Sequence, residues 1–209
     1  MILVANARKG GVGKTTTAVY LAGASAARGW RTVLVDGDPQ GSSSVWAKHA
    51  GELPFAVRSL QDKGLGDDWE CVVIDTPPRD VKAVREGLKV ADQVVVPVGP
   101  SLIEIEELPA TVRLIQAAQE ANPVLRAWIL LTRVRAGTRS ASEVREALES
   151  MSSRPAEAPA GWRPWPATLR TGIPLREAIA GSFGTNPFGG GSSEGTRCYE
   201  DVLAEVMGE

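Results

Sequence analysis

The sequence predicts an α/β protein with a doubly wound, mostly parallel β-sheet and helices on both faces of the sheet. Two patterns indicate this class. Short apolar runs rich in β-branched residues recur along the chain, and they are separated by segments in which apolar residues repeat with the period of a helix. Strands of a parallel sheet have such continuous apolar runs because helices cover both of their faces. From the length of 209 residues we expect one domain, residues 1–209.

Strands and helices are expected to alternate along the chain. The predicted strands are Ile2–Ala5, Thr32–Val35, Cys71–Ile74, Val94–Val98 and Trp128–Leu131. The predicted helices are Thr15–Ala27, Ser42–His49, Asp80–Val90, Ser101–Ala121 and Ser140–Met151. Two stretches rich in proline, glycine and polar residues, Ser152–Pro166 and Gly181–Gly195, are expected to be surface loops within the same domain.

Capping residues support two of these helices. Ser101 with Glu104, and Ser140 with Glu143, have the spacing of a capping box, in which a hydroxyl and a carboxylate bind free amide groups at the helix N-terminus. Pro109 lies inside the fourth predicted helix, and a proline there removes a backbone hydrogen bond. We therefore expect this helix to kink or restart at Pro109.

The composition excludes several classes of protein. The apolar runs are far shorter than the about 20 residues that span a bilayer, and no basic segment with an apolar core opens the chain, so we expect neither a membrane span nor a secretory signal. Cys71 and Cys198 are too few for a disulfide framework or a four-cysteine zinc site. His49 is the single histidine, which excludes a histidine-rich metal site. We expect His49 at the surface and Cys71 buried in its strand.

A glycine-rich segment, KGGVGKTT, lies between the first predicted strand and the first predicted helix. Glycines allow backbone amides to turn inward around a polyphosphate, and the helix N-terminus adds positive potential. Lys14 is expected to reach the β and γ phosphates and the Thr15 hydroxyl to bind Mg²⁺. The alternative, a surface turn, is disfavoured by the flanking strand and helix. The predicted phosphate-binding residues are Lys9, Gly10, Gly11, Val12, Gly13, Lys14, Thr15 and Thr16.

The loop differs from the common motif G-x-x-x-x-G-K-[ST], because Arg8 stands at its first position and Lys9 is an additional lysine. The segment resembles the K-G-G-x-G-K-[ST] loop of the ParA/MinD family of deviant Walker A ATPases. This resemblance implies a P-loop NTPase fold, ATP and Mg²⁺ as cofactors, and hydrolysis of ATP to ADP and phosphate. It also implies a homodimer in the ATP state, in which Lys9 reaches the ATP of the partner subunit.

Three acidic residues follow predicted strands and extend the resemblance. Asp36 and Asp38 lie in VDGDPQ, which resembles the Walker A′ sequence V-D-x-D-P-Q of the family, and Asp75 ends a strand in VVIDTPP, which resembles its Walker B segment. The resemblance implies that Asp38 positions or polarises the attacking water. The implied catalytic residues are Lys9, Lys14 and Asp38, and the implied metal site is Thr15, Asp36 and Asp75, the aspartates through water. Taken singly, each acid could be an ordinary solvated turn or strand end.

Adenine recognition has a weaker sequence signal. Thr132 and Arg133 follow the last predicted strand, and Ile173 and Pro174 lie further along the chain. These positions resemble the places where members of the family hold the base, so we expect all four residues to bind adenine. The alternative is that an arginine or proline after a strand serves only the local loop.

The net charge of −2 is unevenly divided along the chain. Residues 126–176 hold nine arginines and four acidic residues, whereas residues 177–209 hold one arginine and six acidic residues. The first stretch could bind DNA phosphates without sequence preference, or its arginines could form salt bridges within the chain. The candidates for DNA binding are Arg139, Arg145, Arg170 and Arg176. The acidic end, Tyr199–Met207, argues against docking to an anionic membrane.

Among the relatives, short partition proteins of the ParA type fit best because V-D-x-D-P-Q is nearly complete here. The loop begins at residue 9, so we expect no N-terminal helix-turn-helix. The resemblance implies a cytoplasmic ATPase, nucleoid-associated when ATP-bound, that binds nonspecific DNA and segregates plasmid or chromosomal DNA with a ParB-like or other cargo-bound activator. The alternatives are an ATPase that positions a protein assembly and a dimerising nucleotide switch with little catalysis.

Overall fold

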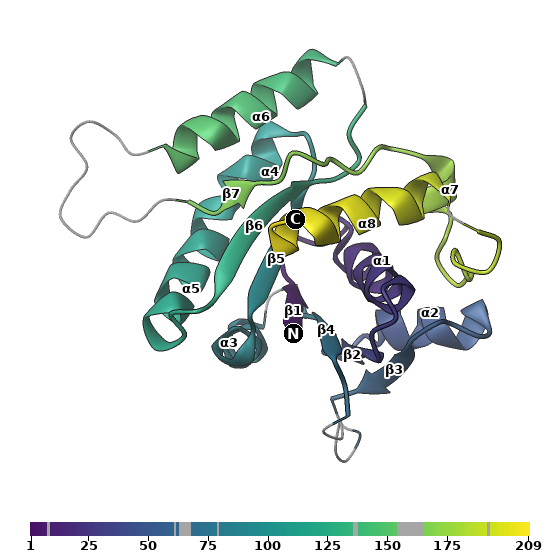
Figure 1. Cartoon of the computed structure of the whole chain (residues 1–209). Coiled ribbons are helices and arrows are strands. Elements are labelled where there is room, and N and C mark those ends of the chain that lie inside the picture. The colour runs from purple at the N-terminus through teal and green to yellow at the C-terminus, as the bar shows by residue number, and fades with distance from the viewer. Residues whose placement is uncertain are drawn as a thin grey trace.

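The molecule is built on one parallel sheet with helices on both sides (Figure 1). The computed structural model describes residues 1–7, 9–60, 62, 68–78, 80–135, 138–153, 165–191 and 193–209. Within these residues the strand order is β3-β2-β4-β1-β5-β6-β7, and all pairs are parallel. The strands are β1 (Ile2–Ala5), β2 (Thr32–Asp36), β3 (Ala56–Ser59), β4 (Cys71–Asp75), β5 (Gln93–Val98), β6 (Arg126–Leu131) and β7 (Ala167–Thr168).

The helices form two layers, which confirms the predicted fold class. One layer packs with the first hydrophobic cluster and contains α1 (Lys14–Ala27), α2 (Ser42–Ala50), α7 (Glu177–Ala180) and α8 (Glu194–Met207). The other packs with the second cluster and contains α3 (Val81–Val90), α4 (Leu102–Glu106), α5 (Leu108–Ala121) and α6 (Arg139–Ser152). The carboxyl ends of all the strands meet at one edge of the sheet, which is where ligands bind in folds of this kind.

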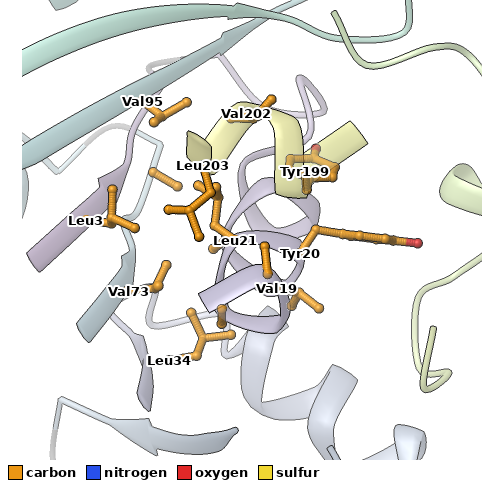
Figure 2. Packing of buried hydrophobic residues seen from close by; sticks show 14 of the residues in the cluster. Leu3, Val19, Tyr20, Leu21, Leu34, Val73, Val95, Tyr199, Val202 and Leu203 are labelled. Atoms are coloured by element: carbon orange, nitrogen blue, oxygen red, sulfur yellow. The ribbon is translucent and has the colours of Figure 1, made fainter. Parts of the chain in front are cut away.

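The apolar strands are buried on both faces because their side chains alternate between the two clusters. Leu3 of β1 and Val95 of β5 belong to the cluster under α1 and α8, whereas Val4 belongs to the cluster under α3 and α5. Figure 2 shows Leu3 and Val95 on the side of the sheet that faces Leu21 of α1 and Leu203 of α8. Continuous runs of β-branched residues in the sequence therefore correspond to strands covered on both sides.

The positions of the five predicted strands are confirmed, and the structure adds two strands at the edges of the sheet. The edge strand β3 carries the exposed Arg58 and β7 has only two residues, so neither has the apolar run on which the prediction depended. The predicted helix Ser101–Ala121 divides at Glu107 into α4 and α5, with Pro109 in the first turn of α5. The expected restart at Pro109 is therefore confirmed.

The two predicted capping boxes are wrong. Ser101 precedes α4, but its side chain forms no capping hydrogen bond with the described residues, and Glu104 binds groups outside the helix. The next predicted box fails because α6 begins at Arg139, after Thr138, so that Ser140 lies inside the helix. In the first case tertiary partners replace the local contact that the spacing predicted.

The acidic end of the chain forms α8, a helix that the sequence analysis did not predict. Its apolar face, with Val202, Leu203 and Val206, is buried in the cluster that α1 also joins. The hydroxyl groups of Tyr199 and Thr17 lie 3.1 Å apart, which links α8 to the second turn of α1. Burial raises the pKa of Tyr199, opposed by this hydrogen bond. The acidic residues of this segment therefore accompany a buried structural helix.

Residues 181–191 of the predicted loop Gly181–Gly195 contain turns and no regular helix or strand, residue 192 lies outside the described residues, and α8 begins at Glu194. The loop is fastened to α2, because the indole nitrogen of Trp46 donates a hydrogen bond of 2.8 Å to the carbonyl of Thr185. Most of the other predicted loop, Ser152–Pro166, lies outside the described residues.

Candidate functional site

The glycine-rich loop connects β1 to α1 at the carboxyl edge of the sheet. Gly11 and Gly13 have φ angles of 75° and 91°, a backbone region that glycine adopts without strain. Gly13 is also the N-cap of α1, and its carbonyl accepts the first helical hydrogen bond, from the amide of Thr17 at 2.8 Å. The amides of the first helical turn have no intrahelical acceptor, so the loop and helix together form an anion-binding end. Arg8 lies outside the described residues.

Lys14, the first residue of α1, lies close to two of the predicted carboxylates. Its side chain is buried, and burial lowers the pKa of its ammonium group, while the charges of Asp75 and Asp38 oppose that change. The two carboxylates partly neutralise the charge of the buried lysine. The negative charge of a bound polyphosphate is suited to replace part of theirs. The position agrees with the role that the sequence predicts for Lys14.

Two aspartates end neighbouring strands and face two serines of α2. Asp36 ends β2 and Asp75 ends β4, and the two residues are partners in the register of the sheet. Oδ2 of Asp36 accepts hydrogen bonds from the amide and hydroxyl of Ser44, at 2.8 and 2.7 Å. Oδ2 of Asp75 accepts a hydrogen bond of 2.8 Å from the hydroxyl of Ser43. The serines thus orient both carboxylates, a function that the sequence analysis missed.

The carboxyl group of Asp75 has a raised pKa. Its side chain is 1% exposed, and burial raises its pKa to about 6, although hydrogen bonds from Thr15 and Ser43 and the charge of Lys14 favour the ionised form. The charge of Asp36 acts in the same direction as burial. Oδ1 of Asp75 is buried and has no hydrogen-bond partner among the described residues. A buried carboxylate oxygen without a donor is a suitable acceptor for a metal-bound water.

Asp38 lies in the turn that follows β2 and is partly exposed. One of its oxygens accepts a hydrogen bond of 2.9 Å from the amide of Gln40, and its charge acts on Lys14. The preceding Gly37 donates its amide to the carbonyl of Asp75 at 2.8 Å, and a Cβ at this position would lie 2.7 Å from that oxygen. Glycine is therefore required for the close approach that brings Asp38 beside the strand end of Asp75.

The loop borders a pocket of about 200 Å³ that also contains every residue predicted to contact adenine. Thr132 and Arg133 follow β6, and Ile173 and Pro174 follow β7. The remaining lining residues are Gly11, Val12, Gly13, Thr16, Leu175, Arg176, Ile179, Ala180 and Tyr199. The structure thus brings the four predicted residues together beside the phosphate loop, with an apolar wall that suits a planar base.

Backbone contacts hold this pocket in place. The Thr132 hydroxyl donates a hydrogen bond of 3.0 Å to the carbonyl of Val12, which joins the end of β6 to the phosphate loop. The amide of Ile173 donates to the carbonyl of Leu131 at 2.8 Å, and Pro174 forms a parallel bridge with Val134. Two segments that are distant in sequence are therefore fixed next to each other. Tyr199 and Ile179 enter the pocket from α8 and α7, and no sequence signal identified them.

The additional lysine, Lys9, contacts an acidic residue of its own chain. Its Nζ lies 3.9 Å from Oε1 of Glu104, the third residue of α4. The same oxygen accepts a hydrogen bond of 2.6 Å from Nη2 of Arg133, and Oε2 accepts one from the amide of Gly99. The spacing of Glu104 from Ser101 predicts a capping box and gives no indication of this contact with a predicted site residue.

The four arginines predicted to bind DNA all have contacts within the chain. Arg139 lies 3.6 Å from Glu143 and its side chain is 94% exposed, and Arg170 lies 3.6 Å from Glu205 with its side chain 87% exposed. Arg145 donates to the carbonyls of Leu169 and Arg170, at 2.9 and 3.2 Å, and so ties α6 to the end of β7. Arg176 pairs with Glu194 at 2.9 Å and lines the pocket of about 200 Å³ beside the glycine-rich loop. Of these four arginines, Arg139 and Arg170 therefore have the most exposed side chains.

The described residues contain neither a cluster of metal ligands nor a helix that could cross a membrane. Within them, no three histidine, cysteine or acidic residues form a group that could hold a metal ion by themselves. None of the described helices is both long and apolar enough to cross a membrane. Because the described residues form no group of metal ligands, a metal at this site would rely on water and on a ligand such as phosphate in addition to the protein.

As predicted, His49 is exposed and Cys71 is buried.

Comparison with known sequences identifies related proteins. The sequence model of CbiA, described as the CobQ/CobB/MinD/ParA nucleotide binding domain, matches residues 2–161. Maintenance of carboxysome distribution protein A from Gloeobacter kilaueensis is 40% identical over 157 residues, which cover 70% of this chain and 68% of that protein. The chromosome-partitioning ATPase Soj from Thermus thermophilus is 29% identical, and the match covers 99% of this chain and 94% of that protein.

Solved structures show the same fold. McdA from Cyanothece in complex with ATP has a TM-score of 0.73 and 16% identity, over 100% of this chain and 96% of that chain. Cobyrinic acid a,c-diamide synthase from Mycobacterium smegmatis, with a bound ATP analogue and magnesium, has a TM-score of 0.66 and 21% identity, over 98% of this chain and 94% of that chain. The arrangement is that of P-loop NTPases, as the sequence predicts.

Proposed function

The chain belongs to the CobQ/CobB/MinD/ParA family of nucleotide-binding domains, and on this basis we propose that it is a ParA-type ATPase that positions a cargo. In this proposal it binds ATP with Mg²⁺, dimerises, binds DNA without sequence preference and is released by hydrolysis. One observation carries the proposal: Lys9, Lys14 and three aspartates surround the glycine loop at one edge of the sheet, next to a pocket of about 200 Å³.

Different residues of the chain hold the phosphates and the base of the nucleotide. The loop amides and Lys14 bind the phosphates, because both are positive groups at the N-terminus of α1. The base occupies the pocket between Thr132, Arg133, Ile173 and Pro174. The Thr132 hydroxyl donates a hydrogen bond to the loop carbonyl of Val12, and this bond fixes the base pocket next to the phosphate loop.

The residues present fit Mg²⁺. We assign it to Thr15, Asp36 and Asp75, with the carboxylates acting through water. Both oxygens of Asp36 already accept hydrogen bonds, whereas Oδ1 of Asp75 is buried without a donor among the described residues. When bound with ATP, the ion would neutralise charge on the phosphates. The Ser43 hydroxyl holds the Asp75 carboxylate in place through Oδ2.

Two residues are assigned to turnover. Asp38 is partly exposed in the turn beyond β2, and one carboxylate oxygen is fixed by the amide of Gln40, so the other is available to orient a water for attack on the γ phosphate. Lys9 is 36% exposed at the rim of the loop, from which it can reach the phosphates of a second subunit. A cation supplied in trans stabilises charge that develops on those phosphates, as an arginine finger does.

The cargo has two candidates. The likeness to a protein named for the maintenance of carboxysome distribution favours a protein assembly as cargo. The likeness to a chromosome-partitioning ATPase favours DNA. In either case the ATPase would bind nonspecific DNA in the nucleoid and respond to an activator carried by the cargo, such as a ParB-like protein.

The site is tested by two substitutions, each with a matched control. Lys9→Ala should bind ATP but lose ATP-dependent dimerisation or turnover, whereas Lys48→Ala, which removes an exposed lysine of α2, should behave as wild type. Asp38→Ala should bind ATP and hydrolyse it poorly, whereas the exposed Asp201→Ala should not. Nucleotide binding, sedimentation and phosphate release are measured for each. Normal dimerisation and turnover in Lys9→Ala, or normal turnover in Asp38→Ala, would contradict the assignment.

DNA binding is tested by reversing the accessible charge. The double variant Arg139→Glu, Arg170→Glu should lose retention on DNA at low salt while binding ATP normally, because nonspecific binding depends on contacts with phosphates. The exposed Arg113→Glu on α5 is the control. The pull-down compares ATP with ADP. Equal retention of wild type and double variant would remove these arginines from the DNA contact, and no retention with either nucleotide would remove DNA from the proposal.

A further inference from the structure

Glu104 joins three parts of the site and has no assigned function in it. It lies near the start of α4, and its side chain is only 11% exposed. Its oxygens contact Lys9 from the phosphate loop, Arg133 from the end of β6 and the amide of Gly99 from the end of β5. A carboxylate so nearly buried is stable because these positive and donor groups compensate its charge.

The contacts of Glu104 are unequal. The Arg133 contact is short, 2.6 Å from Nη2 to Oε1, and the Gly99 amide occupies the other oxygen. The Lys9 contact is long, 3.9 Å from Nζ to the same Oε1, and the lysine side chain is 36% exposed. If Lys9 leaves, Arg133 and Gly99 still compensate the carboxylate. Among the partners of Glu104 in the described residues, Lys9 is therefore the one that can dissociate without leaving a bare buried charge.

Arg133 connects this contact to the nucleotide pocket. It lines the pocket beside Gly11 and Gly13, and it is the one residue other than glycine, among those described, with a positive φ, 56°. Such a backbone is uncommon for an L residue and persists only where surrounding contacts hold it. Here the contacts are the Glu104 carboxylate and the neighbouring bond from Thr132 to Val12.

We propose that Glu104 is a positioning residue that holds Lys9 on its own subunit until the phosphates of a second copy of the chain take the lysine away. This inference rests on the proposed function, since it needs an ATP-dependent dimer. In the monomer, the carboxylate keeps the lysine beside α4. During dimerisation, each subunit exchanges one weak intrachain ion pair for a contact with the partner's nucleotide. Glu104 therefore opposes dimerisation and keeps the monomer from pairing before both nucleotide sites are filled.

The test uses Glu104→Gln, which keeps the shape of the side chain and its carbonyl oxygen but removes the charge. Its matched control is Glu106→Gln, which removes an exposed carboxylate from the same helix. The Lys9–Glu104 contact is long and its lysine is partly exposed, so we give it the value of an exposed ion pair, about two- to fivefold in an equilibrium constant. For two subunits, Glu104→Gln should therefore strengthen the dimer formed with Mg²⁺ and a nonhydrolysable ATP analogue by about fourfold to twenty-fivefold. Glu106→Gln should match wild type. Analytical ultracentrifugation gives the constants.

A second measurement follows the lysine directly. Amine-selective labelling of the nucleotide-free protein, quantified by mass spectrometry of the Lys9 peptide, should be about two- to fivefold faster in Glu104→Gln, because the lysine loses its partner. The exposed Lys48 is the internal reference and should label equally in both proteins, whereas the buried Lys14 would label faster only after a general loss of structure. Glu104→Asp, which keeps the charge but shortens the side chain, should also label faster at Lys9 and serves if the glutamine variant does not fold.

The outcomes separate the inference from the proposed function. Faster labelling of Lys9 together with a stronger dimer supports the inference. Unchanged labelling overturns it. If the wild type dimerises with ATP and Glu104→Gln dimerises no more strongly, the inference is overturned and the proposed function stands. If neither wild type nor Glu104→Gln dimerises with the analogue, both the proposed function and the inference fail.

Discussion

Asp75 should make the nucleotide-free protein less stable as the pH rises. Its carboxyl group has a pKa raised from 3.8 to about 6 in the folded protein, chiefly by burial. Between these values the folded chain binds more protons than the unfolded chain, so the free energy of unfolding falls as the pH increases. Below about pH 4 the carboxyl group is protonated in both states, so it does not lower the free energy of unfolding. Above about pH 6 the folded protein holds a buried charge, and the loss of stability that this charge causes is complete.

The size of the penalty follows from the pKa difference. Each pH unit corresponds to about 1.36 kcal/mol, so the shift of Asp75 amounts to about 3 kcal/mol. The side chain is 1% exposed, so solvent screening reduces this value little. Asp75→Asn replaces the carboxylate by a neutral group of the same shape that can still accept the Ser43 hydrogen bond. We therefore expect the variant to gain up to about 3 kcal/mol over wild type above pH 6 and almost nothing near pH 4.

Urea denaturation of the nucleotide-free protein at a series of pH values from 4 to 8 measures this difference. Asp201→Asn, an exposed substitution on α8, controls for the removal of one negative charge. Adding Mg²⁺ and ATP should stabilise wild type at pH 8 and stabilise Asp75→Asn much less, because the variant lacks the charge that favours the ion. Parallel stability curves for wild type and Asp75→Asn across this range would refute the argument.

Two further substitutions test the packing that supports the site. Gly23→Ala on α1 should destabilise the protein by about 1 to 3 kcal/mol, although alanine favours helices, because the new methyl group meets the ring of Phe188; a stability equal to wild type in urea would show that the ring moves away freely. Glu205→Ala should cost about 1 to 3 kcal/mol and weaken nucleotide binding, because Glu205 accepts the amides of Arg170 and Thr171 at 2.8 and 2.7 Å, just before the pocket residues of that segment; unchanged affinity by calorimetry would contradict this.

Local patterns in the sequence were sufficient for the centre of the fold. The strands β1, β2, β4, β5 and β6 are buried on both faces, so each needs a continuous apolar run that is visible in the sequence. The loop glycines Gly11 and Gly13 are likewise required by local backbone angles. Edge strands lack this constraint. That is why β3, with the exposed Arg58, and the two-residue β7 were not predicted.

Contacts between distant segments limited the prediction of the site. Ser43 and Ser44 bind the predicted aspartates, and the only signal for them was a run of serines at the start of a helix. Glu104 has the spacing of a capping box with Ser101, yet its carboxylate binds Arg133, 29 residues away. The spacing allows a capping box, but the charged guanidinium of Arg133 is a stronger donor to the carboxylate than the helix amides are. The sequence does not show that Arg133 lies within reach of Glu104.

The division of charge along the chain has a different meaning once the chain is folded. Within the described residues, two ion pairs join residues 126–176 to residues 177–209: Arg170 with Glu205 and Arg176 with Glu194. The excess of positive charge that the segment count indicates is therefore partly neutralised within the molecule. If the protein binds DNA as proposed, the DNA phosphates must compete with Glu205 for Arg170. That pair is long, 3.6 Å, and the arginine side chain is 87% exposed, so the competition costs little. Arg176, held at 2.9 Å by Glu194 beside the pocket of about 200 Å³, is the less accessible of the two arginines.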